Sequence, residues 1–288
     1  MSNPGDSVAI ARAYMDSLVV EGRIVGAVRP STRFDFLGES FEMPIMTAAL
    51  SHLDLAGMAE GARMACAPVS IGMGSTEELG QVLATGARVM KIIKPYADPE
   101  AIRSRIRAAE AQGAIAVGMD VEHAPNVEDA EDSVVAGFPM KLPTLSELRG
   151  YIRSTSLPFF IKGALSAKDA LTCLDLGCAG VVLSHHNGLL RWAAPPVMLL
   201  PDIRRAVGSR LILIADGGIE SGFDAFKALA LGADAVTVGR ALMQALKERG
   251  AEGVRDEMLR FNRQLQAMML RTGSPDLRHI DPAVIHRL

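Results

Sequence analysis

The sequence is poor in cysteine and in aromatic residues, and it contains no long apolar run. Its three cysteines, Cys66, Cys173 and Cys178, are odd in number, lie in apolar contexts and have no Cys-x-x-Cys spacing. This usage predicts reduced core thiols in a cytoplasmic protein and gives no sign of a metal site. No stretch of about 18 apolar residues is present, so we expect no membrane span.

Neither sign of charge is in large excess, because the 288 residues include 30 Lys and Arg and 33 Asp and Glu. Proteins that bind nucleic acid or an anionic membrane concentrate basic residues on one surface. The first residues carry Asp6 and Asp16 and lack the basic-then-apolar pattern of a secretory signal. We therefore expect a small-molecule partner and no nucleic-acid partner.

What the chain does contain is a series of short runs rich in Val, Ile and Ala, separated by amphipathic stretches. The runs show no polar alternation, which is typical of parallel strands that are covered on both faces. The predicted strands are Pro44–Ala48, Arg63–Ala67, Arg88–Ile93, Ile115–Met119, Phe159–Lys162, Gly180–Ser184, Leu211–Ala215 and Ala235–Gly239.

Helix signals lie between these strands. Ser75 and Glu78 have the spacing of a capping box, Pro99 suits a first helical turn, and Ser166 opens another helix. A glycine closes a helix just before the next strand at four places, Gly86, Gly113, Gly177 and Gly232. The repeated order helix, glycine, strand predicts an α/β fold, a (β/α)8 TIM barrel that forms one domain over residues 1–288.

Two segments lie outside this repeat. Residues 1–40 form an N-terminal extension in which Asp6–Leu18 is predicted to be helical. Residues 121–143 form a long loop after the fourth strand and contain His123 and an acidic run. Loops of this length are usually functional or mobile, although a simple insertion is the alternative.

In a barrel of this type the active site lies at the carboxyl ends of the strands. The polar residues expected there are Ser70, Lys91, Lys94, Asp120, Lys162, Ser184, His185, His186 and Asp216. Charge at a buried strand end is costly, so several such groups together predict a site. Taken singly, Lys162 could reach solvent along its own stem, and Asp120 could cap a helix.

The last two strands are followed by a predicted phosphate site. Gly217 and Gly218 allow backbone N–H groups to approach an anion, and Gly239 with Arg240 opens the final helix. A helix N-terminus favours an anion, and phosphate sites after strands seven and eight are common in this fold. The alternative is that these glycines only make tight turns.

Four segments resemble the FMN-dependent 2-hydroxy-acid oxidases and dehydrogenases, which include glycolate oxidase and lactate oxidase. They are Phe160-Ile-Lys-Gly163, Val182-Leu-Ser-His-His-Asn-Gly188, Ala215-Asp-Gly-Gly-Ile219 and Ala228-Leu-Ala-Leu-Gly-Ala-Asp-Ala-Val-Thr-Val-Gly-Arg240. The resemblance covers most of residues 15–285 and implies FMN as cofactor and oxidation of an alcohol carbon. It also favours a homo-oligomer, such as a tetramer.

The resemblance further implies roles for individual residues. His186 would take the hydroxyl proton as hydride passes to the flavin, Asp120 would stabilise the protonated imidazole, and Lys162 would lie beside the flavin ring. Cofactor contacts are implied or expected at Ser70, Ser184, Asp216, Gly217, Gly218, Gly239 and Arg240. His185 stands where the family has asparagine and is the other candidate for the catalytic histidine, although the spacing to Ser184 and Gly188 favours His186.

The sequence departs from the family on the substrate side. The arginine that would grip the substrate carboxylate is Leu189 in this chain, after Asn187 and Gly188. Lys94, His185 and Arg191 are the candidates to contact substrate instead, and a larger or less acidic alcohol is the expected substrate. A flavin- or phosphate-binding barrel isomerase and a non-catalytic flavin-binding relative are the alternatives.

Overall fold

The computed structural model describes residues 5–186 and 188–288. Eight parallel strands form its central sheet, in the order β4-β13-β12-β11-β10-β7-β6-β5. They are β4 (Ile45–Thr47), β5 (Val69–Ile71), β6 (Val89–Ile93), β7 (Ala116–Asp120), β10 (Phe159–Lys162), β11 (Gly180–Leu183), β12 (Ile212–Asp216) and β13 (Ala235–Val238).

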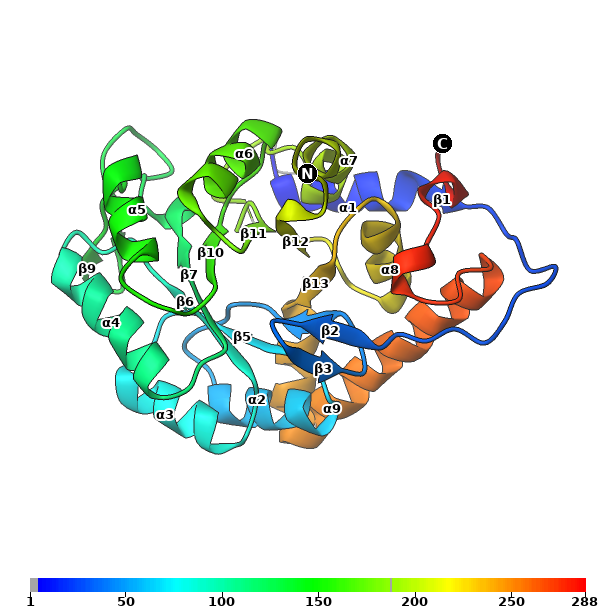
Figure 1. Ribbon diagram of the computed structural model, residues 1–288, viewed down its shortest axis with the longest axis horizontal. Coiled ribbons are helices and arrows are strands. Elements are labelled where there is room, and N and C mark those ends of the chain that lie inside the picture. The colour runs from blue at the N-terminus through cyan, green and yellow to red at the C-terminus, as the bar shows by residue number, and fades with distance from the viewer. Residues whose placement is uncertain (1–4, 187) are drawn as a thin grey trace.

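The sheet closes on itself between its first and last strands. A parallel bridge joins Leu50 to Ile71. The Thr47 hydroxyl accepts from the Ser70 N–H at 2.8 Å and donates to the Ser70 carbonyl at 2.7 Å. The predicted barrel is therefore confirmed, and its strands run through the middle of the molecule (Figure 1).

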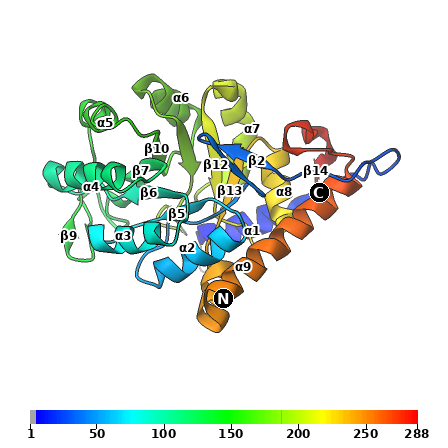
Figure 2. The same ribbon diagram turned by 60° about the horizontal axis from the view of Figure 1, so that its bottom comes forward.

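Helices follow the strands and cover the barrel from outside. They are α2 (Leu55–Met64), α3 (Thr76–Ala84), α4 (Pro99–Ala111), α5 (Leu145–Ile152), α6 (Ala167–Leu176), α7 (Pro196–Val207), α8 (Gly222–Ala230) and α9 (Arg240–Arg271). The long α9 breaks its helical geometry at Arg249 and Gly250 and lies beside α2 (Figures 1 and 2). In the described part of the chain, no helix has both the length and the apolar composition needed to cross a bilayer.

Local signals explain where these helices begin and end. The Ser75 hydroxyl accepts from the Glu78 N–H, and Ser166 does the same for Asp169. The four predicted helix-ending glycines all have left-handed backbones, with φ between 84° and 114°. Because only glycine adopts this conformation at little cost, each chain reversal into the next strand depends on it.

The second predicted strand, Arg63–Ala67, is wrong. Arg63 lies in the last turn of α2, and the strand is Val69–Ile71. Arg63, Met64 and Ala65 are good helix formers, whereas the β-branched residues Val69 and Ile71 come after them. Cys66 also departs from the expected core thiol, because it is exposed in a left-handed turn, while Cys173 and Cys178 are buried.

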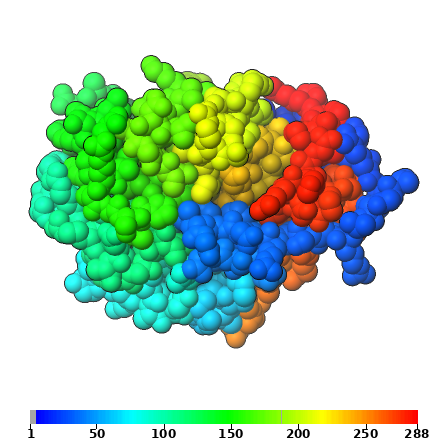
Figure 3. Space-filling view, viewed as in Figure 1, coloured from blue at the N-terminus to red at the C-terminus, as the bar shows by residue number. Residues whose placement is uncertain are grey.

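The N-terminal extension closes the amino end of the barrel. Its hairpin of β2 (Phe34–Phe36) and β3 (Glu39–Phe41) places Phe34 and Phe36 in one buried cluster with Phe160 of β10. The extension also carries α1 (Ser7–Ser17) and β1 (Leu18–Val20), and β1 pairs with β14 (Ile285–Arg287). Figure 3 shows this blue segment on the surface beside the red C-terminal residues. The opposite, carboxyl end of the barrel is thereby left for a site.

The segment 121–143 has structure of its own. It begins with a 3-10 turn, η1 (Val121–His123), and continues into a hairpin of β8 (Val134–Val135) and β9 (Phe138–Pro139). The turn follows directly on β7, so it directs His123 back toward the end of that strand.

Candidate active site

Asp120 is the centre of a buried group of charges at the carboxyl end of β7. Its Oδ2 atom lies 2.9 Å from Lys94 Nζ, 3.1 Å from His186 Nδ1, 3.2 Å from His123 Nδ1 and 3.5 Å from Lys162 Nζ. These five residues, which we call the ionic cluster, come from β7, β10 and the segments that follow β6, β7 and β11. Asp120 itself is 1% exposed.

The surroundings set the charge of these groups. Burial alone would raise the pKa of Asp120, but Lys162, the two imidazoles and Lys94 together hold it well below its usual range. Burial lowers the pKa of His186 to about 4, although Asp120 works against this shift. At neutral pH, Asp120 is therefore a carboxylate, and His186 is a neutral imidazole that can accept a proton.

The backbone after β11 places His186. His186 has a left-handed φ of 43°, which is uncommon for a residue with a side chain, and its N–H donates to Ser184 Oγ at 3.0 Å. Ser184 in turn donates to Asp216 Oδ2 at 2.8 Å and accepts from Lys162 Nζ at 3.1 Å. Thr237 donates to the other oxygen of Asp216 at 2.7 Å. These bonds connect the ionic cluster to the ends of β12 and β13.

An open cavity lies against this end of the barrel. It is lined by Ala48, Ala49, Leu50, Lys162, His186, Asp216, Gly217, Gly218, Ile219, Thr237, Gly239, Arg240 and Met243. Its walls therefore combine a short apolar segment after β4, the lysine and histidine of the ionic cluster, and the loops after β12 and β13.

The part of the cavity wall that follows β12 and β13 is built largely from backbone. Gly217 and Gly218 have φ values of 97° and 77°, and Gly239 caps α9 without any side-chain hydrogen bond. The first N–H groups of a helix lack partners within the helix, so an uncapped helix end attracts an anion. We call Gly217, Gly218 and Gly239 the glycine cradle. Together with Arg240 beside it, the cradle fits a phosphate group.

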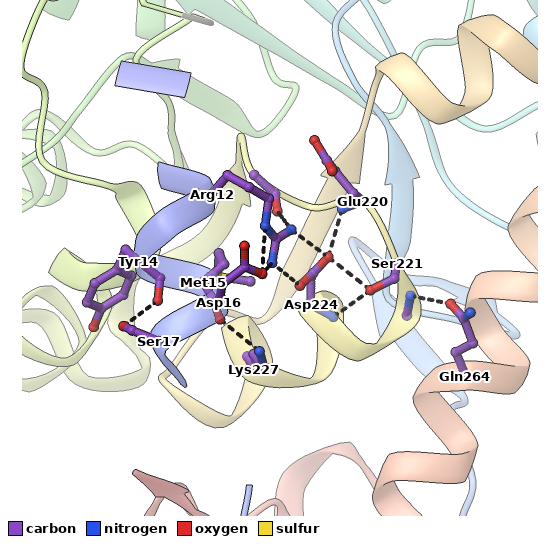
Figure 4. Close-up of polar contacts among 12 residues, drawn as sticks. Arg12, Tyr14, Met15, Asp16, Ser17, Glu220, Ser221, Asp224, Lys227 and Gln264 are labelled. Carbon is purple, nitrogen blue, oxygen red and sulfur yellow. Dashed lines mark hydrogen bonds and ion pairs between the residues drawn. The ribbon is translucent and has the colours of Figure 1, made fainter. Parts of the chain in front are cut away.

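The N-terminal extension holds this cradle from behind. Figure 4 shows Arg12 of α1 reaching α8, where its guanidinium contacts both oxygens of Asp224 at 3.0 and 3.1 Å. The same guanidinium donates to the Gly218 carbonyl at 3.3 Å, and Asp224 accepts from the Glu220 N–H at 3.1 Å. The hydrogen bonds that Arg12 donates to Asp224 raise the pKa of Arg12. A segment outside the barrel repeat thus fixes the loop after β12.

Most of the residues predicted for cofactor and catalysis are brought together. Lys162, His186, Asp216, Gly217, Gly218, Gly239 and Arg240 line the cavity, and Asp120 and Ser184 lie directly behind it. Ser70 is different, because it lies within β5 rather than after it and is 2% exposed. It is not among the cavity-lining residues, and its predicted cofactor contact stays a prediction.

The three predicted substrate contacts are placed apart from one another. Lys94 is buried inside the ionic cluster, and His185 is 1% exposed with neither ring nitrogen hydrogen-bonded within the described residues. Arg191 is on the surface, 3.7 Å from Glu128 of the long loop. Asn187 lies outside the described residues. Their roles toward substrate stay predictions.

Sequence reasoning missed His123 and Glu122 as members of the site. The His123 ring packs edge to face against His186 with 3.9 Å between centroids, and its Nδ1 lies 2.8 Å from Lys94 Nζ. Burial raises the pKa of Glu122 to about 8. The spacing Asp120-x-x-His123, directly after a strand end, is the signal that could have revealed the second imidazole.

A carboxylate and two imidazoles this close together can also attract a metal ion. Here the ammonium groups of Lys94 and Lys162 lie 2.8 and 2.9 Å from the two ring nitrogens involved. Two cations therefore already face those nitrogens, and their charge disfavours a third.

Comparison with known proteins agrees with this geometry. The sequence profile of the FMN-dependent dehydrogenases matches residues 5–144 and 122–287, so this chain belongs to the FMN-dependent dehydrogenase family. The resemblance stated from the sequence is confirmed, and with it FMN as the cofactor. The residues present fit that cofactor, because an uncapped helix end, left-handed glycines and a buried lysine line the same cavity.

Named relatives and solved structures point the same way. L-lactate oxidase of Alicycliphilus denitrificans is 36% identical over 212 residues, which are 72% of this chain and 58% of that protein. L-lactate dehydrogenase of Caulobacter sp. K31 is 40% identical over 44% of this chain and 34% of its own length. A single-residue mutant of mandelate oxidase with (S)-mandelic acid superimposes with a TM-score of 0.89 at 25% identity, over all of this chain and 91% of that one. The chain matches less than two thirds of the length of these sequence relatives.

Proposed function

We propose that this protein is an FMN-dependent oxidoreductase that oxidises the hydroxyl-bearing carbon of a 2-hydroxy acid or a related small molecule. The observation that carries the proposal is that His186 and Lys162, both in contact with Asp120, line one cavity together with the glycine cradle. The names of the relatives, which are lactate oxidases, lactate dehydrogenases and 2-hydroxy-acid oxidases, support the same reaction.

The two ends of the cavity divide the work of holding FMN. The glycine cradle and Arg240 would bind the phosphate through backbone N–H groups and positive charge. Lys162, Ser184 and Asp216 would line the ring end, and Ser70 is retained as a further candidate contact. When bound, FMN supplies the two-electron acceptor that no protein side chain provides.

His186 is the proposed general base. Burial keeps the imidazole neutral, so it can accept the hydroxyl proton of the substrate at neutral pH. The Asp120 carboxylate, 3.1 Å away, stabilises the protonated ring that results. Lys162 places a positive charge in the cavity wall, where it offsets negative charge that develops on reduction.

The substrate side lacks a free cation at the position where the family places arginine, because Leu189 stands there. Lys94 is engaged inside the ionic cluster, and Arg191 pairs with Glu128 on the surface. A bidentate grip on a carboxylate needs a guanidinium, which leucine does not provide. We therefore propose that the substrate is larger or less acidic than a simple 2-hydroxy acid, with Lys94, His185 and Arg191 as its candidate contacts.

The domain structure, assembly and location of the protein are also proposed. We propose one FMN-binding domain over residues 1–288 that assembles as a homo-oligomer, with a tetramer favoured, and acts in the cytoplasm. Exposed apolar side chains around the β8–β9 hairpin, among them Val134, Phe138 and Leu142, support self-association. Light scattering after size-exclusion chromatography measures the assembly directly.

The test is a visible spectrum followed by anaerobic mixing with a panel of hydroxy acids, hydroxy amides and simple alcohols. We expect a yellow protein whose flavin absorbance bleaches with at least one panel member. A yellow protein that never bleaches would instead support a non-catalytic flavin-binding relative or an isomerase. A colourless protein that does not take up added FMN would remove the cofactor assignment itself.

A further inference from the structure

The ionic cluster contains two lysine–imidazole pairs on one carboxylate oxygen. Lys94 Nζ lies 2.8 Å from His123 Nδ1, and Lys162 Nζ lies 2.9 Å from His186 Nδ1. Both ring nitrogens also lie within 3.2 Å of Asp120 Oδ2. Each Nδ1 therefore faces one ammonium and one carboxylate.

Neither ring nitrogen can form a hydrogen bond with the ammonium and with the carboxylate at the same time. An ammonium only donates hydrogen bonds, and a carboxylate only accepts them. A nitrogen that carries a proton can donate to Asp120 but repels the lysine, whereas a nitrogen with a lone pair can accept from the lysine but repels Asp120. An imidazole in its neutral form can therefore bond with only one of the two, and that partner determines whether the outer nitrogen, Nε2, carries the proton.

The two pairs differ in what else their lysines contact. Besides His186, Lys162 donates to Ser184 Oγ at 3.1 Å and forms ion pairs with Asp120 Oδ2 at 3.5 Å and Asp216 Oδ2 at 3.8 Å. Within the described residues, Lys94 contacts only Asp120 and His123, and its side chain is 8% exposed. A buried ammonium with few acceptors needs each of them. Lys94 therefore depends on the His123 lone pair, whereas Lys162 can leave His186 free.

From this asymmetry we propose that His123 is a positioning residue whose tautomer is opposite to that of His186. His123 accepts from Lys94 at Nδ1 and carries its proton on Nε2. His186 carries its proton on Nδ1, donates it to Asp120 and presents an unprotonated Nε2 as the base. The part of this inference that concerns catalysis rests on the proposed function.

The packing is consistent with a positioning role. The two imidazoles meet edge to face at 85°, so the His123 ring limits rotation of the His186 ring. By holding one Lys94 proton, His123 also leaves a lone pair of Asp120 available to His186. Lys94 already donates to Asp120 at 2.9 Å. Without the His123 acceptor, Lys94 would depend on Asp120 alone, and the bond that His186 donates to Asp120 would weaken.

Two variants separate the acceptor from the shape of the ring. His123→Asn keeps an acceptor close to the Nδ1 position, and His123→Phe keeps a flat ring but has no acceptor. We expect His123→Asn to retain kcat within about threefold, and His123→Phe to lose about 10- to 100-fold in kcat with KM little changed, as is typical when an orienting partner is removed. Equal losses in both variants would overturn the proposal.

The pH profile of kcat adds a readout that a purely structural role would not move. The charged and titratable groups that face His186 are Asp120, Lys162, His123 and, behind them, Lys94. In His123→Phe, Lys94 draws Asp120 away, so the protonated form of His186 is stabilised less. The acid limb of the profile should therefore move to lower pH, whereas in His123→Asn it should stay in place.

The decisive measurement needs no turnover. In protein labelled with ¹⁵N-histidine and carrying its bound cofactor, long-range proton–nitrogen correlation reports which nitrogen of each ring is protonated. His123→Asn and His186→Ala identify the two signals. We expect the proton on Nε2 of His123 and on Nδ1 of His186, and the same tautomer in both rings would overturn the proposal. If no substrate bleaches the flavin while the tautomers are opposite, the proposed reaction fails and the assignment of the rings stands.

Discussion

The two ends of the cavity hold charge in different ways. The ionic cluster uses buried side chains from neighbouring strands, centred on Asp120, which is 1% exposed. The glycine cradle uses backbone, with left-handed Gly217 and Gly218 beside an uncapped helix end. The first end depends on which charges are present, and the second depends on which backbone angles are possible.

This difference determines how each end should fail. Charges that share one low-dielectric site depend on one another, because removal of one leaves its partners buried and unpaired. Backbone donors have no side chain to lose, so they fail only when a new side chain forces the chain out of its conformation. Substitutions at the two ends therefore test the comparison directly.

The largest effect on stability is expected from Asp120→Asn. Loss of the carboxylate leaves the buried ammonium groups of Lys94 and Lys162 without their shared partner, which should cost about 3–5 kcal/mol in the free energy of unfolding. Urea denaturation of the purified protein measures this cost. The control is Asp202→Asn on the surface, where the unfolding midpoint should not change. A small change in Asp120→Asn would show that the cluster is not held by charge.

The next effect is a change in how stability depends on pH. Burial raises the folded-state pKa of Glu122 to about 8, above its ordinary value of 4.5. The contribution of the protonated acid is therefore complete below pH 4.5 and is lost as pH rises toward 8. Glu122→Gln keeps the shape of the side chain and does not titrate. The difference in unfolding midpoint, variant minus wild type, should therefore rise between pH 5 and pH 8. Parallel midpoint curves would contradict the buried position of this carboxyl group.

A smaller effect is expected at the glycine cradle. Gly217→Ala places a side chain at a φ of 97°, which should cost about 1–2 kcal/mol. If that strain moves the backbone away from the phosphate, FMN should bind about tenfold more weakly, as equilibrium dialysis would show. Gly150→Ala in α5 is the matched control, because its Cβ would meet no atom within 4 Å. The free energy of unfolding of the control should rise by about 0.5–1 kcal/mol, and it should bind FMN as the wild type does.

The smallest effect is expected from Arg240→Gln. Arg240 is half exposed and pairs with Glu220 at 2.8 Å, so solvent screens its charge. FMN affinity should fall by no more than about fivefold, and the difference from wild type should shrink as salt is added. Arg249→Gln, on the same helix and paired with Asp256, is the control. A loss as large as that of Gly217→Ala would mean that the side chain, rather than the backbone, holds the phosphate.

The sequence predicts the barrel well because each βα unit carries its own signals. Gly177, for example, ends α6 in a left-handed turn three residues before β11 begins, so the boundary is local. The second strand fails for the opposite reason, since Arg63–Ala67 is apolar enough for a strand and only its helix-forming residues distinguish it. Apolarity alone does not separate the two at this length.

The site is predictable where its residues end strands and hidden where tertiary packing supplies them. Asp120 and Lys162 end adjacent paired strands, so their proximity follows from the fold. His123 lies in a loop, and only the 3-10 turn after β7 brings it to Asp120. The contact from Arg12 to Gly218 joins positions 206 residues apart, and no local sequence pattern predicts it.

The proposed role of His186 as the base is tested most directly by the rate of anaerobic flavin reduction in His186→Ala, with a panel member that bleaches the wild type. A general base contributes about 10²- to 10⁴-fold, so the variant should keep its yellow colour and reduce its flavin slower by that factor. His279→Ala, an exposed histidine paired with Asp276, should react like the wild type. Reduction of the His186→Ala flavin at the wild-type rate would contradict the central claim that this imidazole is the base.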